Sequence, residues 1–136
     1  MLQIVYISTM RGPISRTECD LILAASRRNN PGAGITGLLV VGGNRFLQLL
    51  EGPEDAVEAC LARIRSDPRH FALVVLDKRQ VAERACPDWA MGYRTGGGAG
   101  GEGSLEQIVE ALVAPIEEPY LKAQFTSFAK LQDRAA

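Results

Sequence analysis

Apolar runs with single polar positions predict strands at the N-terminus and within residues 35–52. In Leu2–Ser8 the even and odd positions form two separate faces, because successive side chains of a strand point to opposite sides. Residues 35–52 form two apolar runs around Gly42-Gly43-Asn44, which is typical of a hairpin. In the second run Gln48 shares a face with apolar residues. An unpaired buried amide costs about 1–3 kcal/mol, so we expect Gln48 to have fixed partners.

Helical periodicity predicts two helices, and each has recognisable ends. Ser15-Arg-Thr-Glu18 has the form of a capping box that opens the first helix, and Asn30-Pro31-Gly32 should end it. Proline followed by two acidic residues, Pro53-Glu54-Asp55, predicts the start of the second helix, with Pro53 at its first position. Asp67-Pro68 should end this helix. Its apolar stripe has the i, i+3, i+4, i+7 spacing of one helix face and comprises Val57, Cys60, Leu61 and Ile64.

Two further segments, Phe71–Leu76 and Trp89–Arg94, predict the last strands, joined by a polar connection over Lys78–Cys86. The apolar run Phe71–Leu76 is nearly unbroken, which favours a central strand. The resulting order is β-α-β-β-α-β-β, and its first six elements form the split, ferredoxin-like pattern. We therefore expect an α+β fold: a ferredoxin-like mixed sheet with two helices on one face, in which the first strand is central and lies next to the third.

The remaining chain predicts a glycine-rich linker followed by two C-terminal helices. The three expected parts are residues 1–94, a linker over 95–103, and a helical extension over 104–136. Ser104-Leu-Glu-Gln107 is a further capping box. The extension has an apolar stripe that either covers the exposed face of the sheet or forms an assembly surface, and both readings stay open. This stripe includes Leu105, Ile108, Val109 and Leu112.

Composition excludes several classes of protein. The length of 136 residues suits one domain, and 46% hydrophobic with 23% charged residues is ordinary for a globular chain. A net charge of -1 gives no support for a nucleic-acid or anionic-membrane partner. Three widely spaced cysteines and one histidine argue against a disulfide framework or a zinc site. Without a leader-like segment or a long apolar run, we expect a cytoplasmic protein.

Common catalytic motifs are weak in this sequence. The G-x-G-x-x-G match at residues 32–37 enters a strand, whereas a dinucleotide site needs a strand followed by a helix. The match at residues 98–103 lacks a following parallel strand and ribose-binding acid, so we interpret it as a linker. Arg69-His70 fits either a polar wall of a site or a solvated turn. Arg27-Arg28 suits the helix dipole without any ligand.

A polar set remains: Tyr6, Asn29-Asn30, Gln48 and the segment Trp89–Met91. Each member also has an ordinary structural interpretation, such as a half-buried aromatic or a helix stop. In the predicted sheet, however, Tyr6 and Gln48 lie on neighbouring strands and Asn30 ends the covering helix. A phenol and two amides among apolar walls could bind a flat, hydrogen-bonding heterocycle.

Taken together, these residues resemble the BLUF family, the blue-light sensors that use FAD. The resemblance covers residues 1–94, and any single motif would be weak. Its strength comes from all motifs occurring in order and at compatible spacing. They are Tyr6, Arg27-Arg28-Asn29-Asn30, Ile35-Thr-Gly37, Phe46-Leu-Gln48-Leu-Leu-Glu-Gly52, Asp67-Pro-Arg69-His70 and Asp88-Trp89-Ala-Met91.

The resemblance implies that FAD binds between the two helices on the sheet, and that FMN or riboflavin can replace it. It implies that Tyr6 donates an electron and a proton, and that the two-ended amide of Gln48 relays the proton. Trp89 and Met91 are implied in signal output. Some family members have His where this chain has Asn29. The implied cofactor-binding residues are Tyr6, Ile22, Arg27, Arg28, Asn29, Asn30, Gln48, Ile64, Arg69 and His70.

The expected function is therefore that of a short, stand-alone blue-light photoreceptor and not an enzyme. Its implied partners are the flavin, further copies of the chain in a homo-oligomer, and a downstream protein of unknown identity. Two alternatives stay open. One is a ligand-binding or assembly domain without photochemistry. The other is a small enzyme of the acylphosphatase type, although the phosphate-binding loop with its arginine after the first strand is missing.

Overall fold

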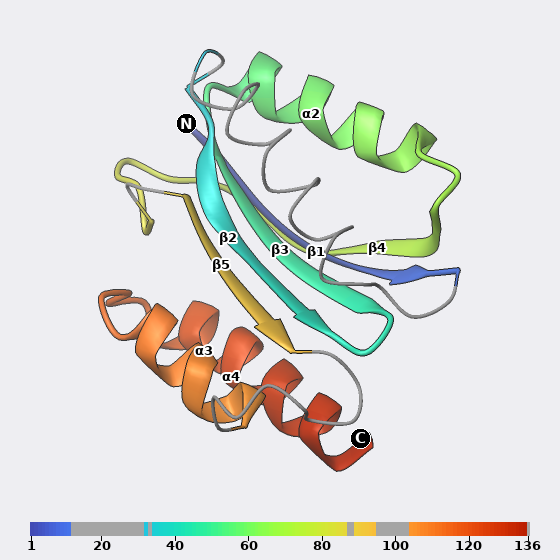
Figure 1. The fold of residues 1–136 in the computed structure, drawn as a ribbon. Helices are drawn as coiled ribbons and strands as arrows, with labels where there is room; N and C mark the ends of the chain where they lie inside the picture. The colour runs from blue at the N-terminus through green and yellow to red at the C-terminus, as the bar shows by residue number, and fades with distance from the viewer. Residues whose placement is uncertain (12–31, 33, 87–88, 95–103, 136) are drawn as a thin grey trace.

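Five strands form one mixed sheet, and helices cover both of its faces (Figure 1). The computed structural model describes residues 1–11, 32, 34–86, 89–94 and 104–135. The predicted first helix lies outside the described residues. The strands are β1 (Leu2–Met10), β2 (Thr36–Gly42), β3 (Arg45–Gly52), β4 (His70–Gln80) and β5 (Trp89–Arg94).

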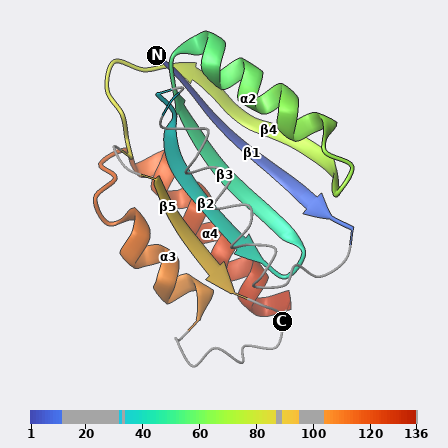
Figure 2. The same ribbon diagram turned by 45° about the horizontal axis from the view of Figure 1, so that its top comes forward.

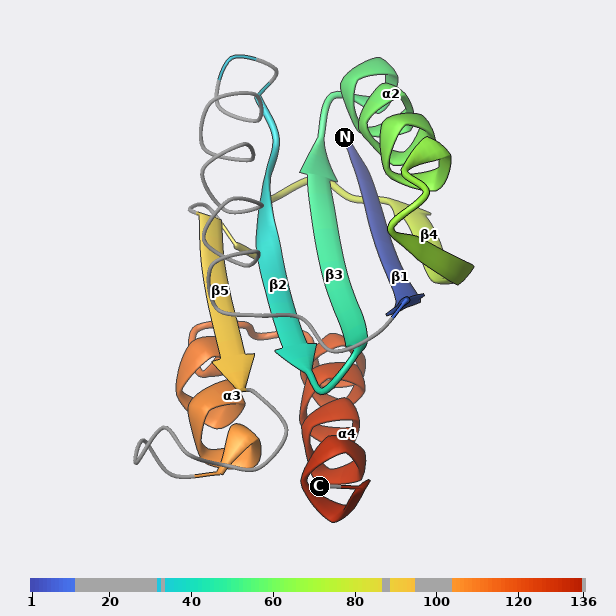
Figure 3. The ribbon, with the colours of Figure 1, turned by 45° about the vertical axis from the view of Figure 1, so that its right-hand side comes forward.

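The strand order is β4-β1-β3-β2-β5, which Figure 3 shows across the sheet. The pairs β1–β3, β1–β4 and β2–β3 are antiparallel, whereas β2–β5 is parallel. The predicted α+β class, the mixed sheet and the place of the first strand beside the third are thus confirmed. This order matters for the site, because it places Tyr6 of β1 directly opposite Gln48 of β3.

The hairpin between β2 and β3 turns at Gly43 and Asn44, since Gly42 pairs with Arg45. Gly43 has a φ of 60°, a left-handed conformation that suits glycine at the first position of a two-residue turn. The turn is fixed to the end of β1, because the Met10 amide donates to the Asn44 carbonyl at 2.6 Å.

Helix α2 (Glu54–Ser66) covers one face of the sheet. Pro53 is its N-cap residue, so the helix begins at Glu54, one position after the predicted first residue. Glu54 and Asp55 lie in the first turn, where the helix dipole favours acids. Val57, Cys60 and Leu61 are buried as predicted. They pack against side chains on the facing side of the sheet, and together these residues form the α2-side cluster. It comprises Leu2, Ile4, Tyr6, Ile35, Leu50, Val57, Cys60 and Leu61.

The prediction that Phe71–Leu76 forms a central strand is wrong. These residues belong to β4, which lies at the edge of the sheet with β1 as its neighbour and which continues through Gln80. Phe71, Val74 and Leu76 are 45%, 52% and 45% exposed. The sequence misleads here because an apolar run reports strand propensity but not whether a second strand or a helix covers it.

Helices α3 (Leu105–Val113) and α4 (Pro119–Ala135) pack on the opposite face of the sheet (Figure 2). The predicted capping box is confirmed, with Ser104 and Gln107 exchanging both hydrogen bonds. None of the helices in the described part of the chain is long and apolar enough to span a membrane. The shared C-terminal cluster comprises Val5, Leu38, Val40, Leu47, Leu49, Leu105, Val109, Val113, Ile116, Leu121, Phe125, Phe128 and Ala129.

The apolar stripe of the C-terminal helices therefore covers the sheet. Leu105 and Val109 are 0% exposed, and Leu112 packs at the border of the cluster. Of the two readings left open by the sequence, the covering role is the one that the structure supports. The two helices are also joined directly, because the Leu105 and Glu106 amides donate to the Asp133 carboxylate at 3.1 and 3.0 Å.

Candidate functional site

The candidate site is built on a direct contact between Tyr6 and Gln48. The two residues are Cα partners in the β1–β3 ladder, and their side chains point to the face that carries α2. The phenol of Tyr6 donates a hydrogen bond to Oε1 of Gln48. Both residues are buried, at 3% and 5% exposure. The expectation that the buried amide of Gln48 has a fixed hydrogen-bond partner is thus confirmed.

Polar atoms of Gln48 and Ser8 at this contact are not used by the Tyr6–Gln48 hydrogen bond. The Tyr6 hydrogen bond occupies only the oxygen end of Gln48, so the amide nitrogen keeps donors available. Ser8 is 1% exposed, and its Oγ has no hydrogen-bond partner in the described part of the chain. Ser8 pairs with Phe46 in the same ladder, on the same side as Tyr6 and Gln48. Buried polar groups are normally satisfied, so these atoms are candidates for hydrogen bonds to a ligand on this side of the sheet.

Burial keeps the Tyr6 phenol protonated. Desolvation raises the pKa of Tyr6 far above its ordinary value, and the nearby Cys60 thiol raises it further. Cys60 comes from α2, so the helix that covers this face also sets the electrostatic environment of the phenol. Like an ordinary tyrosine, Tyr6 is a neutral hydrogen-bond donor at physiological pH, and its raised pKa extends this neutral range to higher pH.

Of the remaining predicted cofactor-binding residues, three belong to the described part of the chain and five lie outside it. Ile64 of α2 is partly buried and packs against the α2-side cluster, on the same face as Tyr6. Arg69 lies in the α2–β4 connection with a side chain 57% exposed, and its guanidinium pairs with Asp67 at 2.6 Å. His70 begins β4, and its backbone pairs with Met10. Outside the described residues lie Ile22, Arg27, Arg28, Asn29 and Asn30.

The two predicted output residues lie on β5, in register with the site. Met91 pairs with Leu39 of β2, and Leu39 pairs with Gln48 of β3. Trp89 pairs with Gly37, two positions earlier along β2. At the backbone level, Met91 therefore lies in the same cross-strand row as Gln48 and Tyr6, and Trp89 lies in a neighbouring row.

Sequence reasoning missed several buried polar residues. Ser8 was visible only as one polar position in an apolar face of the first strand. Gln3 and Glu51 face each other on the opposite side of the sheet, at 7% and 0% exposure. A charged or amide side chain near a strand end usually indicates a solvated position, so only the loop before β5, whose Ala85 and Cys86 amides bind Glu51, reveals that these two are covered. Arg84, which binds the same region, lies in a segment that the sequence marks only as polar.

A family model and several known proteins match most of this chain. The family model described as BLUF, sensors of blue-light using FAD, matches residues 1–92. The photoactivated adenylate cyclase subunit beta of Euglena longa is 37% identical over 89 residues, which are 65% of this chain and 10% of that protein. The chain thus spans about a tenth of the length of this curated relative.

Solved structures of similar proteins extend the likeness to the C-terminal helices. The dark-state structure of BlrB, a BLUF protein, is 27% identical with a TM-score of 0.64, and the match covers 98% of this chain and 94% of that one. Klebsiella pneumoniae BlrP1 with FMN and cyclic diGMP is 32% identical with a TM-score of 0.60, covering 67% of this chain and 25% of that chain. The match to BlrP1 therefore covers only a part of that protein.

Proposed function

This chain belongs to the BLUF family of flavin-binding blue-light sensors, and we propose that it works as a photoreceptor whose light-reactive element is the Tyr6–Gln48 pair. The observation that carries this proposal is the hydrogen bond between two buried side chains, the Tyr6 phenol and the Gln48 amide. The pair lies on the α2-covered face, together with Ser8 Oγ, a buried hydroxyl that has no partner among the described residues.

The residues on this face fit a flavin. A flavin ring is flat and largely apolar, and its edge carries carbonyl oxygens and ring nitrogens. Ile64 and the neighbouring aliphatic side chains offer the apolar surface, while Gln48 Nε2 and Ser8 Oγ offer hydrogen bonds to the edge. FAD is the cofactor named for the family, and FMN accompanies BlrP1. We propose FAD here, with FMN or riboflavin able to replace it.

The other proposed contacts come from motif position. Asn30, with Asn29 beside it, would bind the carbonyl and imide edge of the ring, and Ile22 would pack against it opposite Ile64. Arg69 and His70 would line the site, and Arg27 and Arg28 would bind the phosphates. Asp67 would then hold the Arg69 guanidinium in place through the ion pair described above.

The chemistry of the pair suits a reversible light response. When bound, the flavin supplies the absorption of blue light and an excited state that accepts an electron. Tyr6 is a suitable donor, because a phenol that loses an electron becomes strongly acidic and gives up its proton. The acceptor atom of that proton is already in place, since Tyr6 hydrogen-bonds to Gln48 Oε1. Gln48 can return the proton with its amide reoriented, because its two ends are a donor and an acceptor.

The output of such a cycle is a changed hydrogen-bond pattern and not a chemical product. We propose that the reoriented amide is sensed by Trp89 and Met91 of β5. Support comes from the register, in which Met91, Leu39 and Gln48 follow one another across three strands. Strand β5 contacts α3, so the C-terminal helices can pass the change to a partner protein, either a second copy or a downstream target.

Two substitutions test the role of the pair. Gln48→Leu and Tyr6→Phe should still bind the flavin, because the apolar surface is kept, but should lose the light-induced red shift of flavin absorption. Gln80→Leu and Tyr120→Phe serve as matched controls, since Gln80 lies on the edge strand and Tyr120 is 55% exposed. The measurement is a light-minus-dark absorption spectrum of each purified protein with FAD.

A normal photocycle in Gln48→Leu would overturn the relay role of the amide, and one in Tyr6→Phe would overturn the donor role of the phenol. A purified wild-type protein that cannot be loaded with any flavin would favour the alternative of a ligand-binding or assembly domain. The acylphosphatase-like alternative predicts hydrolysis of an acyl phosphate by the flavin-free protein.

A further inference from the structure

Glu51 is a charged residue buried completely at the end of β3, at 0% exposure. Its carboxylate accepts three hydrogen bonds: from Gln3 Nε2 at 3.1 Å, from the Ala85 amide at 3.0 Å and from the Cys86 amide at 2.5 Å. Two of these donors belong to the loop between β4 and β5. A buried carboxylate persists only when hydrogen bonds replace its hydration, so this loop and Glu51 stabilise each other.

Arg84 attaches the same loop to the start of β2 and, a second time, to β3. Its guanidinium donates to the Gly34 carbonyl at 2.7 Å, to Thr36 Oγ1 at 2.7 Å and to the Glu51 carbonyl at 3.0 Å. Thr36 begins β2, and Glu51 lies near the end of β3. The backbones are close together here, because a Cβ on Gly52 would lie 2.6 Å from the Gly34 oxygen that Arg84 binds.

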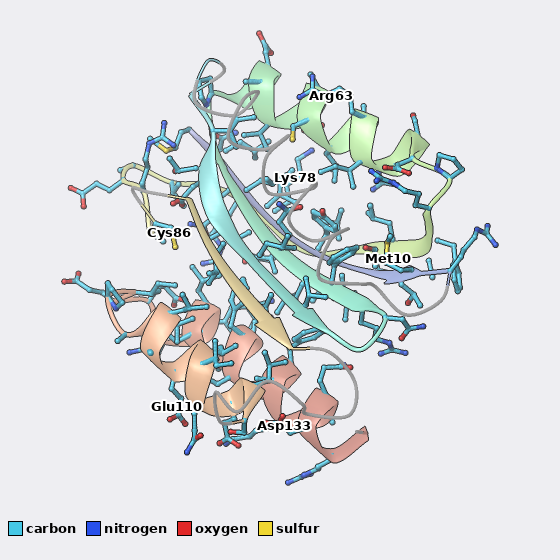
Figure 4. All side chains as sticks on the ribbon, viewed as in Figure 1. Met10, Arg63, Lys78, Cys86, Glu110 and Asp133 are labelled. Carbon is cyan, nitrogen blue, oxygen red and sulfur yellow. The ribbon has the colours of Figure 1, made fainter. Side chains whose placement is uncertain are left out.

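The loop held in this way lies between the sheet and the C-terminal helices. Ala85 and Cys86 pack against the C-terminal cluster, and Figure 4 labels Cys86 in the loop that precedes β5. Burial and the Glu51 charge raise the pKa of Cys86 to about 12, so its thiol stays neutral and packs as an apolar group.

The attachment also limits where β5 can lie. Trp89 begins β5 three positions after Cys86, and three residues span at most about 11 Å. Strand β5 is at the edge of the sheet, so β2 is its single neighbour among the described strands. Besides its pairing with β2 and its contact with α3, β5 is attached to the rest of the fold through this loop, so the position of the loop influences the register that aligns Met91 with Leu39 and Gln48.

We propose that Glu51 and Arg84 form an anchor that positions β5, and that this anchor is required for a change at Gln48 to reach α3 and α4. Both are positioning residues that act through the loop. The side chain of Glu51 lies on the face opposite Tyr6, and Arg84 binds groups at the start of β2 and near the end of β3. The first half of the proposal concerns the protein in the dark. The second half rests on the proposed photoreceptor function.

Hydrogen exchange in the dark tests the first half. In Glu51→Gln one carboxylate oxygen becomes a donor that faces an amide donor, and in Arg84→Ala the three bonds to Gly34, Thr36 and Glu51 are lost. Amide exchange in residues 84–94 should accelerate at least about tenfold in each variant, while exchange within β1 and β3 stays unchanged. The matched controls Glu58→Gln and Arg65→Ala alter solvent-accessible side chains of α2 and should leave residues 84–94 as in the wild type. Unchanged exchange in a folded Arg84→Ala protein would overturn the anchor, even if Glu51→Gln fails to fold.

The same measurement under blue light, with FAD bound, tests the second half. Both anchor variants should keep the red shift of flavin absorption, because Tyr6 and Gln48 are intact, but should lose at least about half of the light-induced exchange difference in α3 and α4. A full wild-type difference in both variants would overturn the coupling role. If the wild type itself shows no red shift, the photoreceptor proposal fails, whereas the dark measurement still decides the anchor.

Discussion

Buried polar side chains on β1 and β3 divide the sheet into two functional faces. Tyr6 and Gln48 lie on the α2 side, whereas Gln3 and Glu51 lie on the side of the C-terminal helices. Each pair consists of directly opposed residues in one antiparallel ladder, where side chains are close enough to interact. The first pair leaves donors available for a ligand, while the second is saturated by the loop before β5.

The raised pKa of Tyr6 predicts a pH dependence of stability. Above pH ~10 the phenol ionises in the unfolded chain but not in the folded one, so the unfolded state binds fewer protons. The free energy of unfolding should therefore fall by an additional ~1.4 kcal/mol per pH unit above pH ~10, and be unaffected by this group below it. Urea unfolding of the flavin-free protein measures this slope.

Tyr6→Phe should lack the additional slope, while Tyr120→Phe, which removes an exposed hydroxyl, should keep it. Each variant removes one phenol, buried in Tyr6→Phe and exposed in Tyr120→Phe, so a difference between their slopes reports the effect of burying Tyr6. Equal slopes for the wild type and Tyr6→Phe would show that the phenol is not held neutral by the fold.

At this scale the sequence predicted the Tyr6–Gln48 contact, because strand alternation and the β-α-β-β order together place the two residues opposite each other. It could not predict the role of Glu51. A carboxylate within a strand is normally solvated, and its burial depends on a loop more than thirty residues away. Long-range contacts of this kind leave no local periodicity.

Strand β4 shows where element prediction failed and why. Its pairing with β1 shifts register between Val5 and Tyr6 and again between Ile7 and Thr9. Such bulges add residues to one strand, increase its twist and are common on edge strands. At the second shift Ala72 has a φ of 53°, a left-handed conformation that costs an alanine about 1–2 kcal/mol. The bulge lies opposite Ser8, next to the Tyr6 site.

Ala72→Gly should therefore stabilise the protein. Removing the Cβ relieves the left-handed strain, and the greater freedom of glycine in the unfolded chain offsets part of the gain. We expect the free energy of unfolding to rise by about 0.5–1 kcal/mol, measured by urea unfolding.

The control is Ala123→Gly, at an exposed position of helix α4. Here the same chemical change should lower the free energy of unfolding by about 1 kcal/mol, because glycine is unfavourable inside a helix. A loss of stability of similar size at both positions would mean that Ala72 is not strained in the folded protein.

In the whole molecule the sheet is the middle layer, and both of its covered faces are needed. The side toward α3 and α4 buries Val5, Leu38, Val40, Leu47 and Leu49, all at 0% exposure. At about 1.5–3 kcal/mol for each side chain, exposing all five would cost about 8–15 kcal/mol. This is as large as the total stability of a typical domain. The sequence divided the chain into a sensor and an extension, but this apolar face joins them.

A chain that ends at residue 103 should therefore fail to fold as a stable monomer, which size-exclusion chromatography and urea unfolding can determine. Leu131→Ala in the full chain is the control, since Leu131 belongs to α4 but is 60% exposed and should alter stability by no more than about 0.5 kcal/mol. A monomeric truncated chain that unfolds cooperatively at the wild-type urea concentration would contradict this view.

The most direct test of the photoreceptor function is the absorption spectrum of the wild-type protein with bound FAD, recorded before, during and after blue light. The intact Tyr6–Gln48 pair predicts a small red shift of flavin absorption that reverts in darkness without consumption of a substrate. A flavin spectrum that stays unchanged under blue light would contradict the proposed function.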